Sequence, residues 1–360
     1  MQNLDELRDR IDTIDDEILS LLNKRMEFVK SIGELKNKNK TPIYRPEREK
    51  AIISRLVEQK HINLDKKAIE AIFYEIFSVS RNLEKAQNVA FLGPIGTHTH
   101  QAAKSRFGAI SSYLPLSNIK SVFNALLNKE AKYGVVPIEN NTEGVVGATL
   151  DCLKDNFEYI KIVGEIYMDI HHCFLSLNSD LKMIEKIYSH PQAYNQCKDF
   201  IEEHNLFDIA FIPTKSTAQA TKFASSDPKS AAIASFISGE IYNVPVLFEK
   251  IEDNKFNRTR FFILSDYKNE KTQNNKTSIL AKTDHKPGGL VELLSMFRNY
   301  GINLTRLESR PMKNKDFKTL FYIDFIGHID DECVQDVLHL ASKNGHEISW
   351  LGSYINGDLQ

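Results

Sequence analysis

The feature that most constrains the fold is an apolar stripe along the start of the chain, in which side chains recur in alternating steps of three and four. This spacing is the repeat of one face of an α-helix. A helix from Leu4 to about Lys38 would be roughly 50 Å long at 1.5 Å per residue. The glycine-poor region that follows is too short to cover such a helix, so we expect a second chain to pack on it, giving a homodimer or a higher homo-oligomer. The stripe consists of Leu4, Leu7, Ile11, Ile14, Ile18, Leu21, Arg25, Phe28, Ile32 and Leu35.

Glycine and proline divide the chain into regions. Of the 16 glycines, only Gly33 precedes Gly93, which predicts a helical region at the start. A second helix is expected to begin near Pro46, with proline in its first turn, and a third near Asp65. Residues 265–277 contain a single apolar side chain and are predicted to be a linker. The predicted domains are therefore residues 1–87, 88–265 and 277–360.

Polar side chains interrupt the apolar stripes of the predicted helices. Arg25 lies on the first stripe, whereas Ser80 and Glu84 continue the third. A buried, unpaired arginine is costly, so Arg25 must meet an anion. Lys36 follows on the same face, roughly 16 Å further along, so both cations can reach one anionic ligand. Arg8 lies about 25 Å from Arg25 in the other direction and can join this site only from an antiparallel partner helix.

Two interpretations of these charges remain open. In the first, Arg25 forms a structural ion pair with Glu84 or Glu49 inside a helical dimerisation module. In the second, several cations and a few acids in the bundle core bind a small dicarboxylate, because arginine holds carboxylates through paired hydrogen bonds. The pattern alone supports both equally.

Several short motifs occur across residues 4–84. They are Leu7-Arg8, Ile11-Asp12, Leu22-Asn23-Lys24-Arg25, Gly33-Glu34-Leu35-Lys36, Pro46-Glu47-Arg48-Glu49 and the pair Ser80 and Glu84. Through these motifs the region resembles the all-helical chorismate mutases. The resemblance implies that Arg8, Arg25, Arg48, Glu49 and Ser80 bind the substrate. It gives no role to Arg45, since many members carry Asp there.

The reaction that this resemblance implies is the rearrangement of chorismate to prephenate, which needs no nucleophile. The protein holds a dianion in a compact chair and stabilises charge that develops on the ether oxygen. Lys36 and Glu84 are the implied catalytic pair at that oxygen. A carboxylate donates a hydrogen bond only when it is protonated, so Glu84 predicts mutase activity that rises toward mildly acidic pH.

From Val89 onward, short strands alternate with helices, and small polar residues follow the strand ends. Free N–H groups at such helix starts bind anions in α/β folds, although Ser, Thr and Asn are also ordinary helix caps. Two such lobes around a cleft would give a fold like that of periplasmic binding proteins. The junctions are residues 93–97, 139–144, 189–192 and 213–217.

Residues 88–265 carry a set of motifs at and near these junctions. They are Gly93-Pro94-Ile95-Gly96-Thr97, Val135-Val136-Pro137-Ile138-Glu139-Asn140, Ser189-His190-Pro191-Gln192, Ser216-Thr217-Ala218 and Asn257-Arg258-Thr259-Arg260-Phe261-Phe262. Through them the region resembles prephenate dehydratases, which implies loss of CO₂ and hydroxide from prephenate to give phenylpyruvate. By resemblance, Thr259 assists the departing hydroxyl and Arg260 neutralises a carboxylate. The resemblance also implies that Asn140, Ser189, Gln196 and Thr217 line the cleft.

The last region predicts the order βαββαβ, an α+β ferredoxin-like fold. Its strands are expected at 277–283, 302–311, 317–327 and 346–354, with a turn at Lys313–Asp316. It resembles the ACT regulatory domains of phenylalanine-pathway enzymes through Pro287-Gly288-Gly289-Leu290-Val291 and Glu308-Ser309-Arg310-Pro311. The resemblance implies an allosteric site for phenylalanine between paired subunits. Its residues would be Gly288, Gly289, Leu290, Glu308, Ser309 and Arg310.

Composition and residue spacing limit the kinds of partner and cofactor that we expect for this chain. A formal charge of −2 and the lack of long apolar runs argue against nucleic-acid and membrane partners. The start lacks the basic and apolar segments of a secretory signal, and the four cysteines are widely spaced, so we expect buried free thiols in a cytoplasmic protein. The histidines have no metal-ligand spacing and no glycine-rich nucleotide loop is present, so we expect no metal and no cofactor.

The leading hypothesis is a bifunctional, feedback-inhibited enzyme of phenylalanine biosynthesis with chorismate and prephenate as substrates. One alternative is a single-activity dehydratase whose helical region only dimerises. Another is a non-catalytic amino-acid sensor. Thr259 and Arg260 together with Lys36 and Arg48 favour the enzyme, because a binding protein has little reason to keep all four groups.

Overall fold

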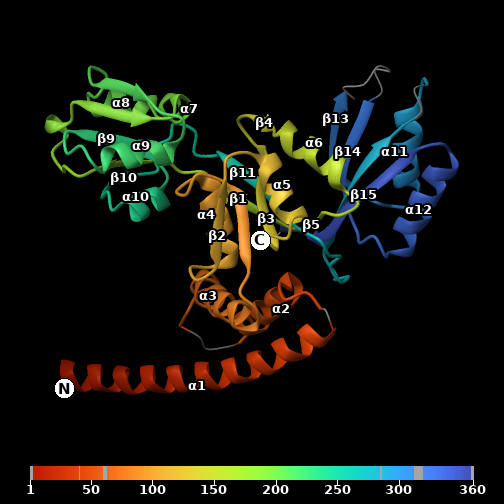
Figure 1. Ribbon diagram of the computed structural model, residues 1–360, viewed down its shortest axis with the longest axis horizontal. Coiled ribbons are helices and arrows are strands. Elements are labelled where there is room, and N and C mark those ends of the chain that lie inside the picture. Colours follow the sequence, from red (N-terminus) through yellow and green to blue (C-terminus); the bar gives the residue numbers. More distant parts are fainter. Residues whose placement is uncertain (1–2, 40, 60–62, 284–285, 312–318, 358–360) are drawn as a thin grey trace. The chain divides into compact units, whose positions relative to one another are not determined.

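The computed structural model describes residues 3–39, 41–59, 63–283, 286–311 and 319–357 (Figure 1). Its contacts divide the chain into two compact units, residues 1–87 with 107–112 and residues 88–106 with 113–360. We call the first the helical unit and the second the α/β unit, and describe each by itself. Among the described residues, every helix is too short or too polar to cross a lipid bilayer.

Three helices form most of the helical unit, and their ends follow from local sequence signals. Helix α2 has Pro46 in its first turn. Asp65 caps α3 by accepting a hydrogen bond from the backbone N–H of Ala68 at 2.8 Å. The helix starts predicted near Pro46 and Asp65 are therefore confirmed. The helices are α1 (Leu4–Asn39), α2 (Pro46–Val57) and α3 (Lys66–Glu84).

The apolar stripe of α1 is exposed in the single chain. Ile11 is 57% exposed, Leu21 63% and Phe28 72%. Among the described residues of α1, Val29 and Gly33 are buried. A continuous apolar face of this length is unfavourable in water and is typical of an interaction surface.

The first lobe of the α/β unit is built on a six-stranded sheet with the order β2-β1-β3-β11-β5 and with β4 on β3. Strands β1 and β3 are parallel, and β11 returns antiparallel between β3 and β5. Its elements are β1 (Asn88–Leu92), α4 (His98–Phe107), β2 (Ser112–Leu116), α5 (Ile119–Leu127), β3 (Tyr133–Asn140), β4 (Gly144–Val145), α6 (Gly147–Asn156), β5 (Lys161–Asp169) and β11 (Arg258–Ser265).

The second lobe has a five-stranded sheet with the order β10-β6-β9-β7-β8, in which β7 is parallel to both neighbours. The chain enters it after β5 and leaves it before β11, so two α/β lobes are present as predicted. Its elements are β6 (Cys173–Ser176), a short 3₁₀ helix (Leu181–Met183), β7 (Lys186–Ser189), α7 (Pro191–Asn195), α8 (Lys198–Glu203), β8 (Ala210–Pro213), α9 (Thr217–Ala224), β9 (Ser230–Ala234), α10 (Phe236–Tyr242) and β10 (Val246–Glu249).

The C-terminal part of the α/β unit has the predicted order βαββαβ and an antiparallel sheet with the strand order β13-β14-β12-β15. Both helices pack on this sheet around a core that includes Phe297, Ile323 and Val337. The turn predicted at Lys313–Asp316 lies outside the described residues. The elements are β12 (Asn275–Lys282), α11 (Gly289–Asn299), β13 (Leu304–Pro311), β14 (Thr319–Ile326), α12 (Glu332–Lys343) and β15 (Glu347–Ile355).

The linker predicted over residues 265–277 is wrong at both ends, since Ser265 belongs to β11 and Asn275 begins β12. Lys276 is buried, and its Nζ contacts Oε1 of Glu165 at 3.0 Å. This ion pair offsets the cost of burying the lysine charge. Between the two strands, Asn269 donates to two backbone carbonyls at 2.9 Å each. A polar segment becomes part of a core when its polar groups find such partners.

The four cysteines are free thiols, as expected. Cys173 and Cys197 are buried, and burial raises the pKa of the Cys173 thiol to about 11. Cys152 is partly buried, but Cys333 is exposed, so the expectation of burial is wrong there. Cys333 lies in the first turn of α12.

Candidate active sites

The helical unit brings the predicted cations of α1 onto the polar residues of α3. Arg25 donates to the hydroxyl of Ser80 at 2.5 Å, and Lys36 donates to the Glu84 carboxylate at 2.7 Å. Burial lowers the pKa of Arg25, and the nearby charge of Glu84 partly offsets that effect. No ion pair of Arg25 with Glu84 is present among the described residues, so the geometry presents a guanidinium bound to a neutral hydroxyl.

Glu49 lies on α2 and is buried, but its partner is one that the sequence did not indicate. Arg81 of α3 forms an ion pair with it. The Arg81 guanidinium also lies over the rings of Tyr44 and Phe107, 5.6 Å and 5.9 Å from their centroids. Arg81 directly follows Ser80 on α3 and, unlike a surface arginine, it is buried.

The other predicted cations of this unit are exposed in the single chain. Arg48 lies on the solvent side of α2. Arg8 lies near the start of α1 and contacts Asp5 one turn earlier at 3.4 Å. Arg45, to which the family resemblance gives no role, pairs with Glu47 at 2.5 Å. Because α1 is one continuous helix from Leu4 to Asn39, Arg8 and Arg25 of one chain lie roughly 25 Å apart.

In the α/β unit, Asn140 and Thr259 meet directly across the β3–β11 pair. The Asn140 Nδ2 donates to Thr259 Oγ1 at 2.7 Å and to Asn257 Oδ1 at 2.8 Å. The Asn140 Oδ1 accepts from the backbone N–H groups of Thr142 at 2.8 Å and Glu143 at 3.1 Å. These two N–H donors fix which amide atom is oxygen, so Thr259 receives a hydrogen bond and keeps its own hydroxyl hydrogen to donate.

The second lobe places its candidate residues at the carboxyl ends of parallel strands, where open α/β sheets bind ligands. Thr217 begins α9, which Ser216 caps through the backbone N–H of Gln219. Ser235, which follows β9, donates to the carbonyl of Gly96 in the first lobe at 2.7 Å. This contact brings the 93–97 loop to the same edge.

Ser189 also lies at this edge, but it is fully buried. Its hydroxyl contacts the carbonyl of Ile233 on the adjacent strand at 3.2 Å. The Ser189 hydroxyl is therefore directed toward the neighbouring strand β9 in this structure, and its place in the substrate cleft stays a prediction.

Gln196 contacts a histidine cluster that the sequence did not indicate. Its Oε1 lies 2.9 Å from Nε2 of His172. The ring of His98, at the start of α4, lies 5.5 Å from that of His172. Burial, reinforced by His172, lowers the pKa of His98 to about 3, so the cluster is neutral at pH 7. Next to it, His171 contacts the Glu252 carboxylate at 2.6 Å.

Arg260 lies in a buried network of charged and hydroxyl side chains. Its guanidinium contacts Glu165 at 2.7 Å, Asp324 at 2.6 Å and the Tyr354 hydroxyl at 3.0 Å, and its side chain is 4% exposed. Although burial lowers it, the carboxylates of Asp324 and Glu165 raise the pKa of Arg260 well above its usual value. Successive residues of a strand point to opposite faces, so Arg260 points away from Thr259. The structure therefore shows the Arg260 guanidinium in a buried network of protein groups, and its contact with a substrate carboxylate stays a prediction.

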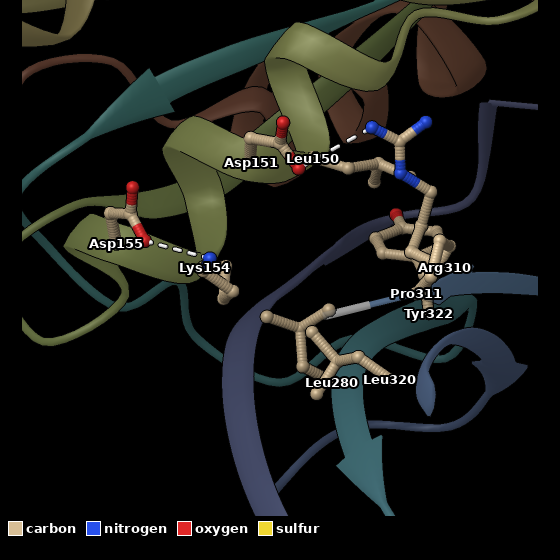
Figure 2. A pocket seen from close by; sticks show the side chains of 9 residues that line it. All are labelled: Leu150, Asp151, Lys154, Asp155, Leu280, Arg310, Pro311, Leu320 and Tyr322. Atoms are coloured by element: carbon tan, nitrogen blue, oxygen red, sulfur yellow. Dashed lines mark hydrogen bonds and ion pairs between the residues drawn. The ribbon is translucent and has the colours of Figure 1, made fainter. Parts of the chain in front are cut away.

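The C-terminal candidates lie on two elements. Gly288, in a left-handed conformation with φ +82°, precedes α11, which begins at Gly289 and Leu290. Glu308, Ser309 and Arg310 lie on β13. Arg310 lines a pocket of about 130 Å³ together with residues of α6, β12 and β14 (Figure 2).

A second cavity of about 370 Å³ lies on the Arg260 face of the first-lobe sheet. Charged side chains of both signs line it, including Glu139, Arg260, Lys276, Arg306 and Glu308. Among the described residues, no group of histidine, cysteine and acidic side chains has the geometry of a metal site.

These features give the chain two candidate sites for small anionic molecules, one on the helices of the helical unit and one on the α/β unit. Residues 7–85 match the family of type II chorismate mutases, and residues 89–269 match the prephenate dehydratases. The chain is 40% identical to the bifunctional chorismate mutase/prephenate dehydratase of Aquifex aeolicus, with 100% of both chains covered. It is 36% identical to that of Pseudomonas aeruginosa, with 98% of this chain and 97% of the relative covered.

Among solved structures, the prephenate dehydratase of Arthrobacter aurescens in complex with L-Phe is similar, with a TM-score of 0.68 and 33% identity. That similarity covers 76% of this chain and 91% of the other. The chain belongs to the family of bifunctional chorismate mutase/prephenate dehydratases.

Proposed function

We propose that the helical unit converts chorismate to prephenate and that the α/β unit converts prephenate to phenylpyruvate, under feedback inhibition by phenylalanine. Membership of the bifunctional family supports both activities. The observation that carries the assignment of residues is the Asn140–Thr259 contact at 2.7 Å, because it leaves Thr259 with its own hydroxyl hydrogen to donate at the end of β3.

In the proposed mutase site, Arg25, Arg48 and Arg8 bind the two carboxylates of chorismate. Lys36 and Glu84 serve the ether oxygen, and their contact at 2.7 Å supports this pairing. The reaction breaks one C–O bond and forms one C–C bond within a single molecule, so the site acts by positioning and by stabilising charge on oxygen. Ser80 and Glu49 complete the site by orienting Arg25 and the substrate hydroxyl.

The proposed mutase site takes Arg8 from a second copy of the chain. The exposed stripe of α1 and the roughly 25 Å between Arg8 and Arg25 of one chain support this arrangement. A mixing experiment tests it. Arg8→Ala and Arg25→Ala should each abolish mutase activity. After denaturation and refolding together, they should regain about a quarter of the parent rate, since half of the dimers are mixed and one of their two sites is intact. No regain would contradict the shared site.

In the proposed dehydratase site, the substrate loses its carboxylate as CO₂, and the electron pair released from the C–C bond makes the ring aromatic. The ring hydroxyl leaves at the same time, and it becomes water by taking up a proton. Thr259 donates a hydrogen bond to that oxygen, directly or through a water, and Asn140 holds Thr259 in place. Thr217 and Gln196 bind the substrate from the second lobe.

Substitution of Thr259 tests this role. Thr259→Ala should abolish dehydration and leave mutase activity at the parent level, whereas Thr259→Ser should keep most dehydratase activity because it keeps the hydroxyl. Equal loss of both activities would indicate a folding defect. Full dehydratase activity of Thr259→Ala would contradict the assignment.

We propose that the C-terminal region is an ACT-type domain that binds phenylalanine at Gly288–Leu290 and Glu308–Arg310. The order βαββαβ and the complex of a similar dehydratase with L-Phe support it. The test is to incubate the purified protein with chorismate and to follow prephenate and phenylpyruvate separately, with and without phenylalanine. Phenylalanine should suppress phenylpyruvate formation. Unchanged phenylpyruvate at saturating phenylalanine would contradict feedback inhibition.

A further inference from the structure

Strand β13 presents a row of charged side chains to the first lobe. Arg306, Glu308 and Arg310 alternate with the exposed residues Thr305, Leu307 and Ser309, as expected of a strand with one covered face. The covered face lies next to both cavities of the α/β unit. Two of the proposed effector residues are therefore directed toward the first lobe.

Two ion pairs join this face to the first lobe. Arg306 pairs with Glu139 at the end of β3, and its side chain is 13% exposed. Arg310 pairs with Asp151 of α6 at 3.4 Å, as Figure 2 shows. The Arg310 guanidinium also packs over Gly147, where a Cβ atom would collide with it.

The segment between these two pairs, residues 139–151, carries Asn140. It runs from the end of β3 through β4 into α6. Thr149 of α6 donates to the carbonyl of Pro137 at 2.6 Å, so the end of β3 and α6 are held together. Arg306 therefore pairs with Glu139, the residue directly before Asn140. Arg310 pairs with Asp151, the last residue of the segment.

We propose that Arg306 and Arg310 are positioning residues of the dehydratase: by holding Glu139 and Asp151, they fix the segment 139–151 and so keep Asn140 against Thr259. This inference rests on the proposed roles of Thr259 and of the effector residues. It also names a route for regulation. Arg310 is already bound to Asp151, so a ligand carboxylate at Arg310 competes with Asp151 for the guanidinium and loosens one end of the segment.

The pair Arg306–Glu139 is tested with Arg306→Gln, Glu139→Gln and the double variant. Each should lower the dehydratase kcat about tenfold, less than the hundredfold that displacement of a reacting group can cost, and leave KM within about twofold. The double variant should be no worse than the singles, because both remove one interaction. The control is Lys282→Gln, which breaks an ion pair with Glu347 inside the C-terminal sheet. It should keep the parent kcat.

The pair Arg310–Asp151 is tested with Asp151→Asn, which leaves every proposed effector residue in place. Without the competing carboxylate, the variant should bind phenylalanine at least about threefold more tightly in a calorimetric titration, because the ligand no longer displaces Asp151. Saturating phenylalanine should also lower the variant's dehydratase rate by a smaller factor than the parent's, since the link that the ligand breaks is already absent. An unchanged or weaker affinity would overturn the competition.

The outcomes separate this inference from the proposed function. If Thr259→Ala lacks dehydratase activity but Arg306→Gln and Glu139→Gln have the parent kcat, the inference fails and the function stands. Additive losses in the double variant would likewise overturn it. If Thr259→Ala keeps its activity, the proposed site itself fails. Mutase activity, measured on each preparation, confirms that the variants are folded.

Discussion

Thr259 and Arg260 are neighbours in the chain, but their side chains lie on opposite faces of β11. Thr259 contacts Asn140 at 2.7 Å on one face, and Arg260 contacts Asp324 of the C-terminal sheet at 2.6 Å on the other. The two residues, which are adjacent in the sequence motif, therefore have different surroundings: Thr259 faces Asn140, and Arg260 faces the C-terminal sheet. Strand β11, which carries the proposed hydroxyl donor, thus contacts the C-terminal sheet through its opposite face.

Arg260→Gln should act on stability before it acts on substrate binding. It leaves the buried carboxylate of Asp324 without its cation, and breaking a buried pair in this way costs roughly 3–5 kcal/mol. Trp350, the single tryptophan of the chain, lies on β15 and reports unfolding of the C-terminal sheet. The urea midpoint of its fluorescence should fall in Arg260→Gln and remain at the parent value in Thr259→Ala. A parent midpoint with only a raised KM for prephenate would restore the substrate role of Arg260.

Glu84→Gln should remove a pH dependence from the mutase. Glu84 can donate a hydrogen bond to an ether oxygen only when it is protonated, whereas a glutamine amide donates at every pH. The parent kcat should therefore fall as pH rises, by up to about tenfold for each pH unit where the carboxyl is mostly ionised, and that of Glu84→Gln should stay flat. Glu34→Gln, at an exposed position of α1, is the matched control and should follow the parent. Identical profiles of Glu84→Gln and the parent would exclude residue 84 as the donor.

The elements that the sequence predicted best are those specified by local signals. The repeat of α1, Pro46 in the first turn of α2 and the Asp65 cap of α3 each act within a few residues, so they identify the three helices. The order βαββαβ is likewise indicated by short strand-like and helix-like runs that alternate along the sequence. Such signals are independent of what the rest of the chain does.

The charged networks depend on partners that are far apart in the chain. Glu165, Arg260, Lys276 and Asp324 come from four strands, and only the packing of two sheets brings them together. Lys276 lies in a polar run that composition alone assigns to a linker. In the helical unit, the sequence does not indicate the role of Arg81 for the same reason, because its anion Glu49 lies on another helix.

Gly96→Ala should impair the dehydratase by disturbing the contact between its lobes. Gly96 has φ +88°, and a Cβ atom there would lie 3.2 Å from the Cβ atoms of Ala218 and Ser238. The left-handed conformation costs alanine roughly 1–2 kcal/mol, and the collision pushes the 93–97 loop from the second lobe. We expect kcat/KM for prephenate to fall at least about fivefold with mutase activity unchanged. Gly301→Ala, with φ +69° and open space around it, carries the backbone cost alone and should retain kcat/KM.

His98→Phe should make the α/β unit less sensitive to acid. Burial and the neighbouring His172 lower the folded-state pKa of His98 to about 3, below the usual value of 6.5. The unfolded chain therefore binds a proton more readily, so this contribution to stability is complete above pH 6.5 and is lost as the pH falls below it, by roughly 1 kcal/mol at pH 5.5. A phenylalanine ring keeps the packing against His172 but has no proton to gain.

The urea concentration that halves dehydratase activity, measured at pH 7.5 and pH 5.5, tests this. The drop between the two values should be smaller in His98→Phe than in the parent. His339→Phe, at an exposed position of α12, should show the parent drop. His172 remains in both variants, so a residual drop in His98→Phe is expected, since burial also lowers the pKa of His172. Equal drops in His98→Phe and the parent would mean that His98 is not the group whose protonation destabilises the fold.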